Sequence, residues 1–218
     1  MLFVASFALV VKHMGKPYVL TTRGSDVLVE LKNMQEKSLA GSWISTFLFG
    51  QFTSLVNKAS AVTSTSYPQG AFVKQAFGVT SQIIRTGVDV EKINTINDQK
   101  YLPDVLRGKK YIFSPRWVRK KYNQQLQVDA IKLLNQKIRD DYFFVFLKYK
   151  DWGKEYLDAL VEQMEEHKIK YIILEHLTQE AIWSALKKTS LMIMTPVSDG
   201  TPNTALEANV KRMPLYIE

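Results

Sequence analysis

The stretch Leu191-Met-Ile-Met-Thr-Pro-Val-Ser-Asp-Gly-Thr-Pro-Asn-Thr-Ala-Leu-Glu207 joins a short apolar run to a helical pattern through a loop of turn-forming residues. The four apolar residues Leu191–Met194 predict a buried strand. Thr201 is a suitable helix N-cap and Pro202 suits the first helical position, so a helix is expected to open near Asn203. A buried strand followed directly by a helix is the unit from which parallel sheets with crossover helices are built.

The same alternation of apolar runs and amphipathic stretches continues through the chain. Strands are expected at residues 18–22, 61–64, 82–85, 110–114, 142–148, 171–175 and 215–217, and helices at 42–58, 67–77, 124–137, 152–167 and 178–188. Residues 94–109 are polar and mark the natural domain boundary. The sequence therefore predicts an α/β fold with parallel sheets in two domains, residues 1–108 and 109–218.

Composition excludes several kinds of site and segment. The 218 residues include no cysteine, which excludes a disulfide scaffold, a thiolate metal site and a cysteine nucleophile. The three histidines, His13, His167 and His176, are scattered, so no zinc site is expected. The apolar opening, Met1–Val11, lacks a basic start and is too short to span a membrane. We expect a buried helix there, not a signal peptide.

The net charge of +8 lies mainly in the first half of the chain. Residues 1–110 carry 13 Lys or Arg and 7 Asp or Glu, whereas residues 111–218 carry 16 and 14. Such a field attracts a membrane surface, a nucleic acid or an anionic substrate, or belongs to an ordinary basic protein. No recognition-helix pattern accompanies the charge, so a nucleic-acid partner is not expected.

The loop 195–202 is also the most informative segment for function. A helix that opens at its end presents unpaired backbone N–H groups at the carboxyl edge of the sheet, which suits a phosphate. Gly200 permits close approach of a ligand to the backbone. Asp199 and Glu207 would repel a phosphate, so they are better explained as acceptors for hydroxyl groups of a sugar or a ribose. A turn acid and a surface glutamate without function are the alternative.

A second segment, Tyr111–Tyr122, carries four cations within six residues, namely Arg116, Arg119, Lys120 and Lys121. They follow a strand expected to end at Ser114, and in a doubly wound sheet that end faces the same crevice as the loop 195–202. Cations there can bind a diphosphate and stabilise a leaving nucleoside diphosphate. A solvated basic turn is the alternative. Trp117 would either stack on a nucleotide base or pack against the protein.

These segments resemble elements of glycosyltransferase family 4. The Asp199–Glu207 pair, with seven residues between the acids, is similar to the family's E-x7-E element. Arg116 and Lys121 look like its diphosphate-binding arginine and lysine. Two earlier segments match in the family's order: Lys16-Pro-Tyr-Val-Leu-Thr-Thr-Arg-Gly-Ser-Asp26 resembles a strand ending in a His-Gly-Ser-Asp loop, and Ile84-Arg-Thr-Gly-Val-Asp89 resembles a Gly-Val-Asp element.

The resemblance implies two Rossmann-like domains in the GT-B arrangement and retaining transfer of a hexose from a nucleotide-diphosphate sugar, without a required metal or cofactor. The implied catalytic residues are Arg116 and Lys121 on the donor diphosphate and Asp199 on the transferred sugar. Donor binding is implied for Glu207, at the ribose hydroxyls, and for Gly200, Thr201, Pro202, Asn203 and Thr204. The implied acceptor-side loop consists of Arg23, Gly24, Ser25 and Asp26.

The resemblance also implies a glycan or lipid-linked acceptor, a part in cell-surface polysaccharide or glycolipid assembly, and a cytoplasmic location. Peripheral contact with the inner face of the membrane is a further alternative, for which the expected helix 42–58 is the candidate. Its aromatic residues are Trp43, Phe47, Phe49 and Phe52. They would either enter a membrane surface, or pack in the core or against the family's missing strands, and we favour the second alternative.

The chain departs from the family pattern at several positions. Asp199 is one methylene shorter than the usual glutamate, and Tyr122 stands where glycine is common. Arg23 replaces the loop histidine, and a permanently charged arginine cannot act as a base at neutral pH. The family's first and last strands have no counterpart, so we expect a chain cut at both ends, with uncovered edges that leave it marginally folded or inactive. A non-catalytic nucleotide-binding remnant and a nucleotide-sugar epimerase of the same architecture are the rival functions.

Overall fold

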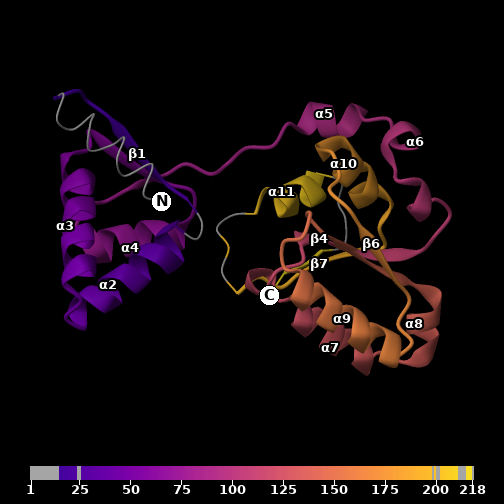
Figure 1. The fold of residues 1–218 in the computed structure, drawn as a ribbon. Helices are drawn as coiled ribbons and strands as arrows, with labels where there is room; N and C mark the ends of the chain where they lie inside the picture. Colours follow the sequence, from indigo (N-terminus) through magenta and orange to yellow (C-terminus); the bar gives the residue numbers. More distant parts are fainter. Residues whose placement is uncertain (1–14, 24–25, 198, 200–201, 211–214, 218) are drawn as a thin grey trace. The chain divides into compact units, whose positions relative to one another are not determined.

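The computed structural model describes residues 15–23, 26–197, 199, 202–210 and 215–217 (Figure 1). The chain divides into two compact units, residues 1–87 with 198–201 and residues 88–197 with 202–218. The expected boundary at residues 108–109 lies some twenty positions later than this division, because the helices that follow Gly87 pack against helices of the second unit. Each unit is described by itself below.

The first unit contains a parallel sheet of three strands in the order β1-β2-β3. The strands are β1 (Val19–Thr22), β2 (Ala61–Ser64) and β3 (Gln82–Ile83). A π-helical segment (Asp26–Leu31) and the helices α2 (Lys32–Leu39), α3 (Trp43–Lys58) and α4 (Tyr67–Phe77) connect them. The predicted bounds of β2 and α4 are confirmed, whereas β3 ends earlier than predicted. The apolar run at residues 18–22 suggests a buried strand, but Val19 of β1 is 62% exposed.

The core of the first unit is built mainly from helix residues packed on β2. Its buried members are Leu31, Val56, Val62, Val73 and Phe77. Phe49 and Phe52 of α3 pack against this core, as expected. Trp43 and Phe47 at the start of α3 do not, because they are 77% and 61% exposed. Core packing is therefore confirmed for two of the four aromatic residues of this helix.

The second unit contains a parallel sheet of five strands in the order β6-β5-β4-β7-β8. The strands are β4 (Tyr111–Trp117), β5 (Phe143–Leu147), β6 (Tyr171–Leu174), β7 (Leu191–Met194) and β8 (Leu215–Ile217). From β4 the chain adds β5 and β6 on one side and then returns to add β7 and β8 on the other. The strand order thus reverses between β4 and β7, and doubly wound sheets bind ligands at the carboxyl ends of the strands on either side of such a reversal.

Helices cover both faces of this sheet. They are α5 (Val90–Thr95), α6 (Asp98–Tyr101), α7 (Gln124–Leu133), α8 (Gln136–Asp141), α9 (Lys154–Glu166), α10 (Gln179–Lys188) and α11 (Asn203–Val210). Alternate residues of β5 belong to two different buried clusters: Phe144 and Phe146 join residues of α7 and α9, whereas Val145 and Leu147 join residues of α10 and α11. Short 3₁₀ turns at Asp104–Leu106 and Lys120–Tyr122 complete the unit.

Two helix predictions depend on capping side chains. The Thr178 hydroxyl accepts a hydrogen bond from the backbone N–H of Ala181 at 3.3 Å, so its predicted role as the N-cap of α10 is confirmed. The single helix predicted over residues 124–137 is instead two helices. Asn135 caps α8 by accepting a bond from the Ile138 N–H at 3.0 Å, and an extended residue, Leu134, precedes it.

Strand β4 is longer than predicted and irregular at its end. Its register against β5 shifts between Ser114 and Trp117, where Pro115 has no N–H to give to the ladder. Arg116 therefore lies within a bulged strand end and not in a turn, and bulges commonly re-aim side chains beside binding sites. The next loop approaches Gly153 so closely that a Cβ there would meet the carbonyl oxygen of Val118 at 2.8 Å.

Several expectations meet the limits of the described residues. The buried helix expected at Met1–Val11 lies outside them. Within the part of the chain that the structure describes, each helix is too short or too polar to span a bilayer. Those same residues include no group of three or more His, Asp or Glu side chains placed to hold a metal ion.

Candidate active site

Hydrogen bonds hold the segments after β4 and β7 together in the second unit. The backbone N–H of Val197 donates to the carbonyl oxygen of Lys121 at 3.0 Å. The Thr195 hydroxyl lies 3.0 Å from the carbonyl oxygen of Asn123 and accepts a bond from Nε2 of Gln127 at 3.0 Å. The prediction that the basic segment and the loop after β7 share one edge of the sheet is thus confirmed.

Gln124 fixes the backbone of the basic segment. Its side chain is fully buried at the start of α7. Oε1 accepts a hydrogen bond from the N–H of Arg119 at 3.2 Å, and Nε2 lies 3.0 Å from the carbonyl oxygen of Trp117 and 3.4 Å from that of Arg116. One side chain therefore sets the path of the chain at Arg116 and for three residues beyond it.

Arg116 and Lys121 both lie beside the ring of Tyr122. The Arg116 guanidinium carbon is 5.2 Å from the ring centroid and the Lys121 ammonium is 5.6 Å from it, both within the range of cation–π attraction. The tyrosine that stands where glycine is common thus contacts the two cations implied to bind diphosphate. Its ring limits the directions in which their charged groups can lie.

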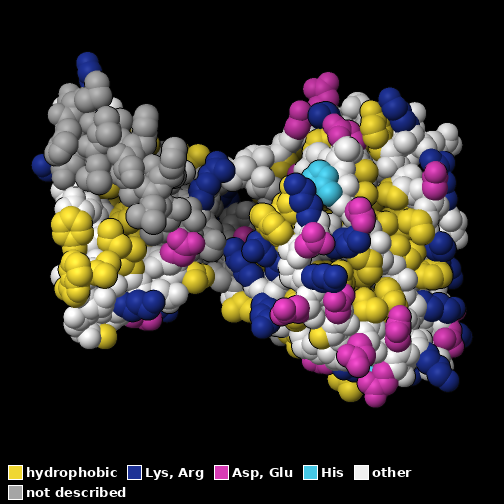
Figure 2. Space-filling model, in the orientation of Figure 1, with side chains coloured by type: hydrophobic (Ala, Val, Ile, Leu, Met, Phe, Trp, Pro, Cys, Tyr) yellow, Lys and Arg dark blue, Asp and Glu magenta, His cyan; other side chains and the backbone are white. Residues whose placement is uncertain are grey.

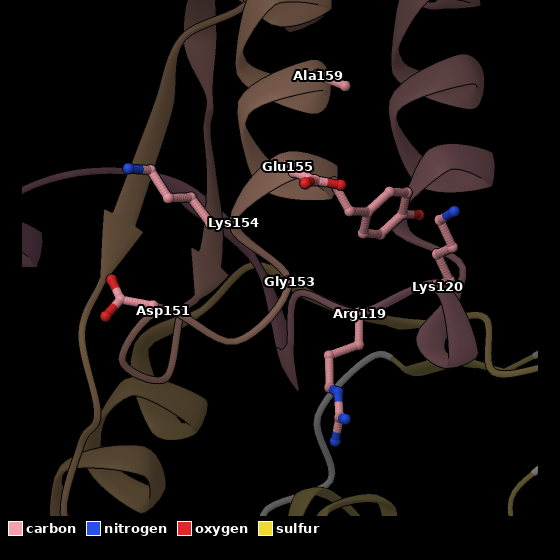
Figure 3. A pocket seen from close by; sticks show the side chains of 8 residues that line it. Arg119, Lys120, Asp151, Gly153, Lys154, Glu155 and Ala159 are labelled. Atoms are coloured by element: carbon pink, nitrogen blue, oxygen red, sulfur yellow. The ribbon is translucent and has the colours of Figure 1, made fainter.

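The other two cations, Arg119 and Lys120, line a cavity of about 600 Å³ beside the start of α9 (Figure 3). The guanidinium carbon of Arg119 lies 4.8 Å from the ring centroid of Trp152. The remaining lining residues are Asp151, Gly153, Lys154, Glu155, Tyr156 and Ala159. Neither Arg116 nor Lys121 lines this cavity, so the four cations that stand together in the sequence divide into two groups.

Trp117 packs against other aromatic side chains. Its ring stacks on Tyr149 with the centroids 4.6 Å apart and the planes at 18°, and it meets Trp152 edge-on at 6.1 Å. Tyr149 also meets the His176 ring at 5.2 Å. The sequence contains a signal for this cluster that our prediction missed: each aromatic residue lies at or just after the end of β4, β5 or β6, and parallel strands end at one edge.

Glu207 is 8% exposed in α11, so the alternative of a surface glutamate is wrong. Gln179 of α10 donates a hydrogen bond from Nε2 to its Oε1 at 3.0 Å. Burial raises the pKa of the Glu207 carboxyl above its usual value, and the Trp183 indole, the Gln179 amide and the charge of Arg116 each offset part of that rise. The charge of Arg116, 91 positions earlier in the sequence, therefore acts on the Glu207 carboxyl.

The remaining predicted site residues are placed as follows. Helix α11 begins at Asn203 as expected, the carbonyl oxygen of Pro202 accepts a bond from the N–H of Ala205 at 3.0 Å, and Thr204 lies in the first turn. That turn contains no acidic residue.

Asp199 is half-buried, and Arg23 is exposed directly after β1. The backbone of Asp26 opens the π-helical segment. Gly24, Ser25, Gly200 and Thr201, including the expected Thr201 cap, lie outside the described residues.

Neither a protein-family model nor a curated protein sequence matches the chain. Solved structures do resemble it. HepE from Anabaena, in complex with UDP and glucose, has a TM-score of 0.69 and 14% identity, covering 96% of this chain and 55% of its own. A UDP-forming α,α-trehalose-phosphate synthase from Burkholderia xenovorans has a TM-score of 0.67 and 12% identity, covering 98% and 56%.

A glycosyltransferase from Rickettsia africae is similar at a TM-score of 0.64 and 13% identity, covering 98% of this chain and 60% of its own. The chain thus spans little more than half the length of these proteins. At identities of 12–14%, the similarity to these structures shows a shared fold. The chain has an α/β fold with Rossmann-like parallel sheets, the fold of these GT-B glycosyltransferases.

Proposed function

We propose that the chain binds a nucleotide-diphosphate sugar at the carboxyl edge formed by β4, β7 and α11, and that it acts as a retaining glycosyltransferase of the family 4 type. One observation carries the proposal. Two cations, Arg116 and Lys121, and one buried carboxylate, Glu207, come from separate segments to the point where the strand order reverses. The likeness to HepE, which was solved in complex with UDP-glucose, supports the choice of ligand.

Each group suits one part of such a donor. Arg116 and Lys121 supply positive charge for the diphosphate, and the first turn of α11, around Asn203 and Thr204, contains no acidic residue and adds backbone N–H groups. Glu207 is an acceptor for ribose hydroxyls and is too buried to be a solvent-facing charge. Asp199 is the group that we assign to the hydroxyls of the transferred sugar.

Transfer requires stabilisation of the charge that develops on the leaving diphosphate as the bond to the sugar carbon breaks. Fixed cations and a helix N-terminus oppose that charge without a metal ion, so none is required in this proposal. In a retaining front-face reaction the leaving diphosphate oxygen accepts the proton of the attacking hydroxyl, while the new bond forms on the face from which the diphosphate departs. Arg23 has no role as a base in this scheme.

The pKa of Glu207 predicts how donor binding depends on pH. An ionised carboxylate accepts two hydroxyl donors, whereas a protonated one loses part of that capacity. Because burial raises the pKa of Glu207, donor affinity should begin to fall at a higher pH than an ordinary glutamate would cause. The same protonation relieves the cost of a buried charge, so stability should rise as affinity falls. Calorimetric titrations with donor should show the trend in affinity over a pH series, and thermal unfolding without donor should show the trend in stability. Glu207→Gln should remove both.

The proposed acceptor is a glycan or lipid-linked sugar at the cytoplasmic face of a membrane, and the start of α3 is the candidate for membrane contact. Leu39, Trp43, Ile44 and Phe47 are all more than half exposed, and Figure 2 shows hydrophobic side chains gathered over this part of the first unit. Residues 15–87 carry seven Lys or Arg and three Asp or Glu, a balance that favours anionic lipid.

Replacing Trp43 and Phe47 together by serine should weaken binding to vesicles that contain anionic lipid by roughly a hundredfold, because each of the two buried aromatic rings contributes on the order of 1.5 kcal/mol. Sedimentation with the vesicles measures the change. Tyr67→Ser is the matched control, since Tyr67 is 67% exposed in the same unit but lies on another helix. Equal losses in the two variants, or no binding by the unmodified chain, would refute membrane contact through α3.

The proposed activity is tested by incubating the full chain with UDP-, GDP- and ADP-hexoses and a panel of glycan and lipid-linked acceptors. Release of nucleoside diphosphate that depends on an acceptor, with the anomeric configuration of the product retained by NMR, is the expected result. Donor binding without transfer or hydrolysis would identify a non-catalytic binding protein. An epimerised sugar formed without an acceptor would identify an epimerase.

A further inference from the structure

Two side chains of α10 approach the Glu207 carboxylate. Gln179 and Trp183 are four positions apart and therefore lie on one face of the helix, which packs against α11. The Gln179 amide donates to Oε1 of Glu207 at 3.0 Å, and the Trp183 indole lowers the pKa of the same carboxyl. No motif in the sequence marks either residue for a role in ligand binding.

Trp183 is the more informative of the two. Its side chain is 7% exposed, and its Nε1–H reaches no acceptor with full hydrogen-bond geometry among the described residues. A buried N–H without an acceptor is costly, and phenylalanine would pack in similar space without that cost. The carboxylate whose ionised form this N–H favours is that of Glu207, on the helix against which α10 packs.

A cation lies over the Trp183 ring. The Lys92 ammonium is 5.4 Å from the ring centroid and is held by Glu180 at 3.2 Å. Asp89 caps α5 by accepting a bond from the backbone N–H of Lys92 at 2.9 Å. A cation on the face of an indole draws electron density toward itself, which makes the N–H at the ring edge a stronger donor. Asp89, the last residue of the segment 84–89, thus holds the backbone of Lys92, and the Lys92 ammonium lies over the Trp183 ring.

We propose that Gln179 and Trp183 are positioning residues, which orient the Glu207 carboxylate from the α10 side so that its remaining lone pairs face the vicinal diol of a ribose. A carboxylate offers about four acceptor sites, so donors on one side leave capacity for two ligand hydroxyls on the other. A carboxylate fixed before binding loses less conformational freedom when the ligand arrives. This inference rests on the proposed function and adds to it the residues that select a ribonucleotide.

The test compares ribonucleotides with nucleotides that lack the diol. The affinities of the full chain for UDP, GDP and ADP, and for their 2′,3′-dideoxy forms, are measured by calorimetry for the unmodified chain and for Gln179→Leu and Trp183→Phe. Each substitution should weaken the best-bound ribonucleotide by roughly tenfold, the equivalent of one hydrogen bond to a charged group, and leave the dideoxy form nearly unaffected. Lys188→Ala, an exposed position on the same helix, should change neither affinity.

A second measurement does not depend on a ligand. The pKa of the Glu207 carboxyl, followed by carbon-13 NMR, should rise further in both variants, because each lost donor favoured the ionised form. Equal losses for ribonucleotide and dideoxynucleotide, or an unchanged carboxyl pKa, would overturn the inference while leaving the proposed function intact. Failure of the unmodified chain to bind any of the nucleotides would overturn both.

Discussion

Arg116→Ala is expected to lower kcat/KM for sugar transfer by about 10²–10³-fold, the usual cost of removing one group that stabilises charge in a transition state. Arg116 lies in the bulged end of β4, beside Tyr122 and close enough to Glu207 to influence its pKa. The charge on the leaving diphosphate is greater in the transition state than in the bound donor. The loss should therefore fall more on kcat than on KM.

Arg119→Ala is the matched control for this prediction. Arg119 is three residues further along and has the same charge, but its guanidinium lies over Trp152 and lines the cavity beside α9. The change at Arg119 should have only a small effect on transfer. Equal losses in the two variants would show that the basic segment acts through its overall charge and not through Arg116.

Gln124→Leu is expected to lower the free energy of unfolding by about 3 kcal/mol or more and to weaken donor binding as well. The fully buried amide satisfies backbone groups of Arg116, Trp117 and Arg119, and each buried polar group left without a partner costs roughly 1–3 kcal/mol. Leucine fills a similar volume but satisfies none of them. The loop that contains Arg116 should therefore lose its fixed path.

Urea denaturation measures the stability change, with Gln125→Leu as the control. Gln125 is the next residue of α7 and bonds through its amide to Asp129 and Gln163 near the surface, so its replacement should cost less than about 1 kcal/mol. A Gln124 variant as stable as the Gln125 variant would show that the buried amide does not hold the basic segment.

Much of the fold could be predicted from local patterns. The bounds of β2, β7, β8 and α4 agree with the prediction, because each is a short apolar run or an amphipathic stretch between turn residues. The neighbouring position of β4 and β7 followed from the doubly wound pattern, and with it the meeting of the basic segment and the loop after β7.

Other features depend on contacts between distant residues and could not be predicted locally. The extension of β4 through Pro115 and Arg116 depends on pairing with β5, and the division of the four cations depends on where Tyr122 and Trp152 lie. The burial of Glu207 results from the packing of α10 on α11. Periodicity predicted those helices, but it contains no information on which side chains of one meet those of the other.

The central claim is that the edge formed by β4, β7 and α11 binds a nucleoside diphosphate. Thermal unfolding of the full chain with UDP, GDP, ADP and their sugar conjugates tests it most directly, since a ligand at one hundred times its Kd stabilises the folded state by about 2.7 kcal/mol. The account predicts that the nucleotides of one base raise the Tm of the unmodified chain. The same nucleotides should not raise the Tm of Glu207→Ala or of Arg116→Ala. A cooperative transition that no nucleotide shifts, or a rise that both variants retain, would contradict it.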